Sequence, residues 1–206
     1  RPVEPARFVI DTPDKENAML FARVDLPANL SDADMPALIT ADWIIGGSDG
    51  LSNRIVNRLR QKEGLSYGSG SNITLPSFGN RAKWSVGAIV APQNLAQAEK
   101  SLKDELARAY RDGITEAELA EAKRGIIGSR AVNRAQDGMV ASNWVNNLET
   151  GRTWQFSKET EAAIEALTVE DVNKALRRFC DVSKLTFALA GDLAKAKAAG
   201  KDFTQP

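Results

Sequence analysis

The order of strand-like and helix-like segments constrains the fold of this chain more than any single residue does. Apolar–polar alternation, or a run of small polar residues, predicts four strands, at 18–26, 65–75, 81–91 and 185–189. Helical patterns occupy most other positions, two before the second strand and several before the last. Strands clustered apart from long helical stretches favour an α+β fold with a largely antiparallel sheet and helices packed mainly on one face. No Pro- or Ser-rich linker interrupts the chain, so we predict a single domain, residues 1–206.

Capping residues mark several of the expected helix boundaries. Thr115 with Glu118 predicts a capping box, and Thr168 with Asp171 predicts the start of a later helix. Gly64 is a natural left-handed cap at the end of the helix that precedes the second strand.

Three segments carry weaker signals. Residues 1–13 are expected to form an extended lead-in. Asp137-Gly138 is expected to interrupt a long helical stretch, and the Ala- and Lys-rich tail, residues 195–206, is expected to fray.

Composition excludes several classes of function. The chain has no histidine and a single cysteine, Cys180, so it cannot form an internal disulfide or a zinc site of the cysteine–histidine type. Cys180 ends an apparent amphipathic helix that starts at Asp171, which favours a buried structural thiol over a nucleophile.

The formal net charge is +0, which argues against nucleic acid and membrane surfaces as partners. No apolar run is long enough to span a membrane.

Arg60 and Tyr67 are the candidate functional residues, placed on either side of a helix end and a glycine turn. Arginine presents a fork of donors and tyrosine a phenolic donor, and both suit a carbonyl oxygen that becomes negative in acyl transfer. Neither can activate water. Their spacing alone favours a plainer role, in which Arg60 binds last-turn carbonyls and Tyr67 packs at a strand start.

Other motifs have ordinary structural explanations. The glycine-rich runs 46–50 and 68–70 match no phosphate-binding pattern and suit loops or close packing. The basic strip formed by Arg54, Arg58, Arg60 and Lys62 reads as a solvated helix face. The four tryptophans fit core or interface positions better than a ligand cage.

The segment from Ser52-Asn53-Arg54 to Leu59-Arg60, followed by Glu63-Gly64-Leu65-Ser66-Tyr67-Gly68, resembles the Arg/Tyr-bearing segment of the pitrilysin/insulinase family of zinc metallopeptidases, the inverzincins. Three further stretches are similar to the C-terminal homologous domain of that family: Ile10 to Lys15, Ile45 to Ser48, and Arg134 to Gly138. The resemblance covers essentially the whole chain.

The resemblance implies the non-catalytic half of a peptidase. Family members pair homologous α+β domains around a chamber. The active domain carries HxxEH and a distant glutamate that hold zinc, and the other domain contributes an arginine and a tyrosine to substrate binding and to the tetrahedral intermediate. Arg60 and Tyr67 fall on those two positions, and the absence of histidine excludes the zinc motif from this chain. The implied partners are an HxxEH-bearing domain or subunit and a peptide substrate, with the zinc in the partner, no cofactor here, and a periplasmic location.

Two alternatives stay open. The chain can be a purely structural member of the same fold, as in core subunits of respiratory complexes, or a peptide-binding module that acts alone. The favoured hypothesis predicts no cleavage by this chain without its partner.

Overall fold

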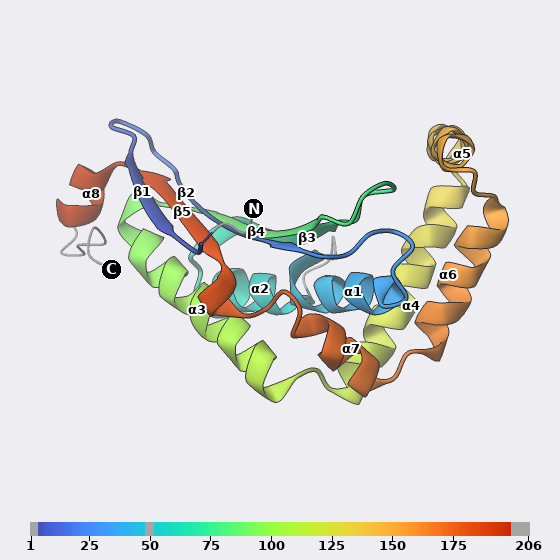
Figure 1. The fold of residues 1–206 in the computed structure, drawn as a ribbon. Helices are drawn as coiled ribbons and strands as arrows, with labels where there is room; N and C mark the ends of the chain where they lie inside the picture. Colours follow the sequence, from blue (N-terminus) through green and yellow to red (C-terminus); the bar gives the residue numbers. More distant parts are fainter. Residues whose placement is uncertain (1–3, 48–51, 199–206) are drawn as a thin grey trace.

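The computed structural model describes residues 4–47 and 52–198 and contains a mixed sheet that carries helices on one face (Figure 1). Its strands are β1 (Arg7–Asp11), β2 (Ala18–Leu26), β3 (Ser66–Thr74), β4 (Ala82–Val90) and β5 (Thr186–Gly191). They lie in the order β1-β5-β2-β4-β3, and every neighbouring pair is antiparallel except β1 with β5. The predicted α+β class and the four predicted strands are confirmed.

The first strand, β1, is a feature that the sequence did not reveal. Residues 1–13 were expected to be an extended lead-in, whereas Arg7–Asp11 pairs in parallel with β5, from Arg7 opposite Phe187 to Asp11 opposite Gly191. β1 lies at the sheet edge, where Phe8 and Ile10 are exposed. Its three apolar residues, 8–10, are consecutive, so its sequence lacks the apolar–polar alternation that predicts a strand, and its partner is far away in the chain.

The α-helices are α1 (Met35–Asp42), α2 (Arg54–Val56), α3 (Leu95–Asp112), α4 (Glu116–Arg134), α5 (Asp137–Thr150), α6 (Trp154–Ala166), α7 (Val169–Leu176) and α8 (Leu193–Ala198). Two of them continue as π-helices, η1 (Trp43–Gly47) after α1 and η2 (Asn57–Lys62) after α2. Short 3₁₀ turns, η3 (Pro92–Asn94) and η4 (Val182–Lys184), complete the described elements.

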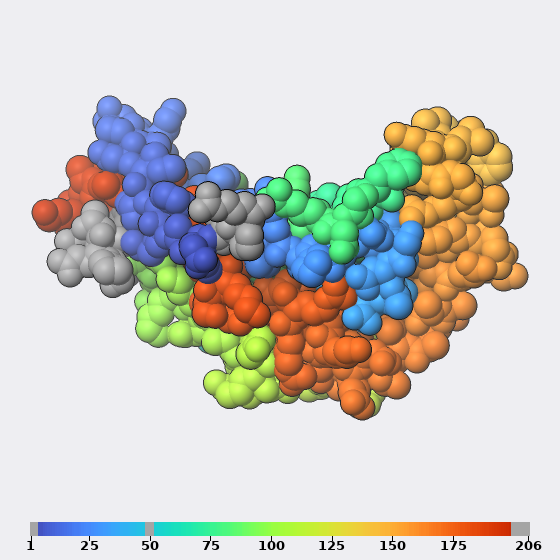
Figure 2. Space-filling view, in the orientation of Figure 1, coloured from blue at the N-terminus to red at the C-terminus, as the bar shows by residue number. Residues whose placement is uncertain are grey.

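Helices α1, α2, α3 and α7 lie under the sheet, while the C-terminal half of α4, with α5 and α6, rises beside it as an arm (Figure 1). The surface above the sheet is therefore concave (Figure 2).

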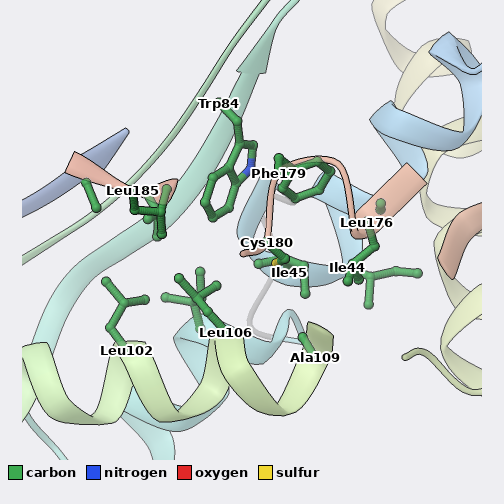
Figure 3. Close-up of a cluster of buried hydrophobic side chains, with 14 of the residues drawn as sticks. Ile44, Ile45, Trp84, Leu102, Leu106, Ala109, Leu176, Phe179, Cys180 and Leu185 are labelled. Atoms are coloured by element: carbon green, nitrogen blue, oxygen red, sulfur yellow. The ribbon is translucent and has the colours of Figure 1, made fainter. Parts of the chain in front are cut away.

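The core lies between the sheet and the helices beneath it. β4 alternates as predicted, and Trp84, Val86, Ala88 and Val90 point inward. The indole ring of Trp84 packs against Phe179 with their centroids 4.8 Å apart. Figure 3 shows these rings above Leu106 of α3. Apolar burial of this kind is the main force that holds helices to a sheet.

The helix caps follow the sequence closely, with one difference. Both capping boxes form, at Thr115 with Glu118 and at Thr168 with Asp171. The break before α5 falls at Ala135 and Gln136, so Asp137 begins the next helix instead of interrupting one.

The beginning of the tail is ordered. Residues 195–198, expected to fray, belong to α8, where Ala196 is fully buried. Burial of this alanine helps to hold residues 195–198 in place, although their sequence alone predicts a frayed tail. Residues 199–206 lie outside the described part.

Candidate functional site

Arg60 is positioned by a helix end that turns sharply. It lies in the π-helix η2, where the preceding residue Leu59 is completely buried and anchors the turn. Gly64 has φ +62°, and its N–H donates to the carbonyl of Arg60 at 3.1 Å. The N–H of Leu65 then donates to the carbonyl of Leu59 at 2.7 Å. The chain thus reverses directly after Arg60, as the glycine cap predicted. π-helical turns of this kind occur frequently at functional sites.

Tyr67 is positioned by an irregularity in the sheet. Ser66 pairs with Val90 and Gly68 pairs with Ile89, so Tyr67 is an extra residue with no partner on β4. The hydroxyl of Ser66 fixes this bulge by donating to the carbonyl of Ile89 at 2.7 Å. A β-bulge bends its strand and re-aims a side chain. Here it leaves the side chain of Tyr67 93% exposed.

The turn and the bulge bring the two candidate residues together. The guanidinium carbon of Arg60 lies 5.9 Å from the centroid of the Tyr67 ring, at the outer limit of a cation–π contact. Both side chains are exposed, and within residues 4–47 and 52–198 neither the guanidinium of Arg60 nor the hydroxyl of Tyr67 has a hydrogen-bond or ion-pair partner. Their donors can therefore reach a ligand without first breaking an internal hydrogen bond or ion pair.

Neighbouring arginines of the same strip have structural roles. Arg54 forms a bidentate ion pair with Glu118, at 2.7 and 2.8 Å, and also donates to the carbonyl of Gly113 at 2.8 Å. Arg58 forms an ion pair with Glu63. The expectation that this strip is merely a solvated face is thus wrong for these two arginines, because Arg54 ties α2 to α4 and Arg58 pairs with the residue that caps η2.

Two carboxylates fix the segment that carries Arg60. Burial pushes the pKa of Glu118 upward, but hydrogen bonds from Arg54 and from the backbone of Thr115 outweigh it and lower that pKa. Glu63 also accepts a bond of 2.6 Å from the hydroxyl of Ser101 on α3. The pKa of Glu63 is lowered as well, so both groups stay ionised at neutral pH and hold this segment through their hydrogen bonds and ion pairs.

Asp42 is a supporting residue that sequence reasoning missed. Its carboxylate is buried and accepts hydrogen bonds from the indole N–H of Trp84 at 2.7 Å, the hydroxyl of Ser71 at 2.6 Å and the backbone N–H of Ile73 at 3.2 Å. Burial raises its pKa from the ordinary value, and the bonds from Ser71 and Trp84 oppose that rise. β3 is the edge strand, and these bonds fasten it to α1. An aspartate at the end of a helix gives no sequence signal for this role, because its partners lie on strands.

The described residues offer little other chemistry. They contain no cluster of three or more His, Cys, Asp or Glu side chains that could hold a metal ion. Cys180 is fully buried, and burial raises the pKa of its thiol, so it is not a nucleophile. Gly68 and Gly70 lie within β3, and the glycine run 46–50 extends into residues outside the described part. Among the helices that the structure describes, none has the length and apolar character needed to cross a membrane.

Solved structures with the same fold come from several organisms. The crystal structure of a peptidase M16 inactive domain from Pseudomonas fluorescens has a TM-score of 0.80 at 23% identity, over 91% of this chain and 44% of that chain. The periplasmic protease PqqL from Escherichia coli gives 0.70 at 16% identity, over 91% and 20% of the two chains. A chain of Complex III2 from Candida albicans, with Inz-5 bound, gives 0.74 at 17% identity, over 95% and 48%. This chain thus spans less than half of each of these three chains.

Sequence comparison assigns the family. No curated protein matches the sequence. Residues 1–126 match the family described as the peptidase M16 inactive domain. That match covers more than half of the chain and includes the turn with Arg60 and the bulge with Tyr67. This chain is therefore a member of the peptidase M16 inactive domain family.

Proposed function

We propose that this chain is the non-catalytic half of a zinc-dependent endopeptidase and that Arg60 and Tyr67 bind its peptide substrate. The observation that carries the proposal is the convergence of these two side chains, by a π-helical turn and a β-bulge, with their donors unused within the described residues. A structural arginine in the same strip, Arg54, is instead bound to a carboxylate.

The chemistry assigned to the pair is stabilisation of negative charge. When a peptide carbonyl is attacked, its oxygen becomes an oxyanion, and the Tyr67 hydroxyl and Arg60 guanidinium would donate hydrogen bonds to it. Donors fixed in place before the reaction stabilise that charge without a reorganisation cost. This chain has no histidine, so the HxxEH-bearing partner domain or subunit would hold the zinc, which supplies an activated water.

The test measures turnover after the chain is combined with its HxxEH-bearing half. Tyr67→Phe removes one hydroxyl from an exposed side chain, so folding should not change, whereas turnover should fall on the order of a hundredfold to a thousandfold. Tyr110→Phe is a matched control, because Tyr110 is the only other tyrosine and lies on α3. Unchanged turnover in Tyr67→Phe would remove the pair from the mechanism.

Arg60→Ala tests the second residue of the pair. The loss of a charged fork should raise KM for the peptide as well as lower kcat, because the guanidinium contacts both the ground state and the transition state. The chain without its partner should cleave nothing. Cleavage by the chain alone would contradict the proposal.

A scaffold role is the second candidate, and the likeness to the Candida albicans Complex III2 chain favours it. A scaffold predicts that Arg60→Ala leaves every activity of the assembly unchanged. If the chain is a stand-alone peptide-binding module, its affinity for peptides should not increase when the partner is added.

The similarity to PqqL supports a periplasmic location, which fractionation of cells that express the protein can test.

A further inference from the structure

A polar cavity that Arg60 and Tyr67 do not line lies where the arm meets the turn between β3 and β4. It has a volume of about 430 Å³, within the range of ligand pockets. Arg134 lines it from the end of α4, Asn143 and Asn146 line it from α5, and Trp154 lines it from the start of α6. Ser77 closes it from the β3–β4 turn, which approaches the arm in Figure 1.

The lining has an excess of positive charge. The described residues around the cavity include three arginines and no aspartate or glutamate. Two of the arginines, Arg130 and Arg134, share one carboxylate behind the wall, that of Glu161. One carboxylate cannot neutralise two guanidinium groups, so one positive charge remains at this wall.

The third arginine, Arg152, has no acidic partner among the described residues. Its guanidinium donates to the hydroxyl of Ser31 at 3.0 Å and lies over the ring of Phe156, 4.4 Å from the ring centroid. Both contacts orient the group and leave its charge uncompensated. A guanidinium held in one orientation is well suited to bidentate recognition of a carboxylate.

Asparagine amides complete the lining. Asn133, Asn143 and Asn146 surround the cavity, and none of their side chains has a hydrogen-bond partner in the ranges that the structure covers. Each amide can donate two hydrogen bonds, and amides do not repel an anion. The cavity therefore combines fixed positive charge with unused neutral donors, a chemistry that selects anions over cations.

The cavity lies beyond the far end of the strand that carries Tyr67. β3 runs from Ser66 to Thr74, and Ser77 in the following turn lines the cavity. Nine residues of strand extend for roughly 30 Å at about 3.3 Å per residue. An extended peptide whose reacting bond lies at Tyr67 would reach the cavity roughly eight to ten residues farther along.

We infer that this cavity, which we call the arm pocket, binds a carboxylate of the peptide substrate about eight to ten residues from the bond that is cleaved. The carboxylate belongs to an acidic side chain or to the C-terminus of the peptide. The inference rests on the proposed function because it takes a peptide as the ligand. It adds a specificity determinant that is separate from Arg60 and Tyr67.

The test is a binding measurement on the 206-residue chain without its partner. Three fluorescein-labelled twelve-residue peptides are compared by anisotropy: one with a single glutamate near an amidated C-terminus, the same peptide with glutamine, and the glutamine peptide with a free C-terminus. The glutamate peptide, the free C-terminus peptide or both should bind about tenfold more tightly than the amidated glutamine peptide, and the comparison identifies the source of the carboxylate. Equal binding of all three, or no binding, overturns the inference.

Two variants localise the effect. Arg152→Gln should remove the preference for a carboxylate, and Asn146→Asp, which puts a negative charge on an exposed α5 position, should remove or reverse it. Arg111→Gln is the control for a lost surface charge, because Arg111 pairs with Asp112 at the end of α3 and does not line the arm pocket. A preference that survives both pocket variants, or that Arg111→Gln also abolishes, overturns the inference.

Failure of the arm pocket and failure of the proposed function give different results. Normal turnover in Tyr67→Phe with an intact carboxylate preference refutes only the role of the Arg/Tyr pair. Loss of turnover in Tyr67→Phe with equal binding of the three peptides refutes only the arm pocket.

Discussion

The region under the sheet and the arm are both helical, yet they differ in how they are held. Under the sheet, α3 buries eight of its residues, among them Leu102 and Leu106, and Trp84 of β4 is completely buried. On the arm, none of the fourteen residues of α5 is buried, and Trp144, Val145 and Leu148 are exposed. The difference teaches that most of the buried apolar surface that stabilises the fold lies beneath the sheet. The side chains of α5 are instead exposed, where a ligand or a partner protein can contact them.

Replacing the central tryptophan tests this contrast with the largest expected effect. Trp84→Ala should lower the free energy of unfolding by about 3–5 kcal/mol, because it empties a large core site and removes the indole donor from the buried carboxylate of Asp42. Trp144→Ala on the arm should cost about 1 kcal/mol, mainly from the stacking on Trp154, whose ring centroid is 5.9 Å away. Urea unfolding followed by circular dichroism measures both. Equal losses would show that the arm is as tightly packed as the core.

Ion pairs in the two regions provide an intermediate test. Glu118→Gln breaks the pair with Arg54 and weakens the capping box of α4, and should cost about 2 kcal/mol at pH 7. On the arm, Glu161→Gln breaks pairs with the more exposed Arg130 and Arg134 and should cost about 0.5 kcal/mol.

The pH dependence of the Glu118 effect has a defined sign. The pKa of Glu118 is lower in the folded state than in the unfolded state, where it is about 4.3. The ionised carboxylate therefore makes its full contribution to the free energy of unfolding above the unfolded pKa, and this contribution is lost as the pH falls through the folded pKa. The difference between wild type and Glu118→Gln should therefore shrink when unfolding is measured below about pH 4. A difference that grows toward low pH would contradict this assignment.

Local chemistry made part of this structure predictable from sequence. The caps at Thr115 and Thr168, and the turn at Gly64, depend on residues within a few positions of each other, and all of them form. The inward face of β4 followed from simple alternation. The same locality explains why Arg60 and Tyr67 could be placed on either side of one turn.

Features that depend on distant partners could not be predicted. β1 needs β5, which lies at the other end of the chain, and the buried carboxylate of Asp42 needs donors from β3 and β4. The bulge at Tyr67 exists only in relation to the register of β4. The arm pocket is assembled from three helices and the connecting segments that carry Leu30, Ser77 and Arg152, and its arginines had no sequence signal that distinguished them from other surface arginines.

Left-handed glycine caps should behave alike in the two regions. Gly64 ends η2 with φ +62° and Gly151 ends α5 with φ +65°, and neither has an atom within 4 Å of the place where a Cβ would lie. Gly64→Ala and Gly151→Ala should each cost about 1 kcal/mol, because the strain is local to the backbone. Thermal unfolding of both variants checks this. A much larger cost at Gly64 would indicate that the turn after Arg60 is strained by its surroundings as well.

The smallest expected effect is at the exposed face of α5. Leu148 is 69% exposed, so Leu148→Ala removes little buried apolar surface and should change the free energy of unfolding by less than about 0.5 kcal/mol. Leu106→Ala on α3 is the matched substitution in the core and should cost about 2–5 kcal/mol, because Leu106 is completely buried. Both variants remove the same side-chain atoms from a helix, so the difference between their free energies of unfolding reports the burial of the leucine and not the type of residue. A loss of more than about 1 kcal/mol in Leu148→Ala would mean that the arm contributes to the folded core of this chain itself.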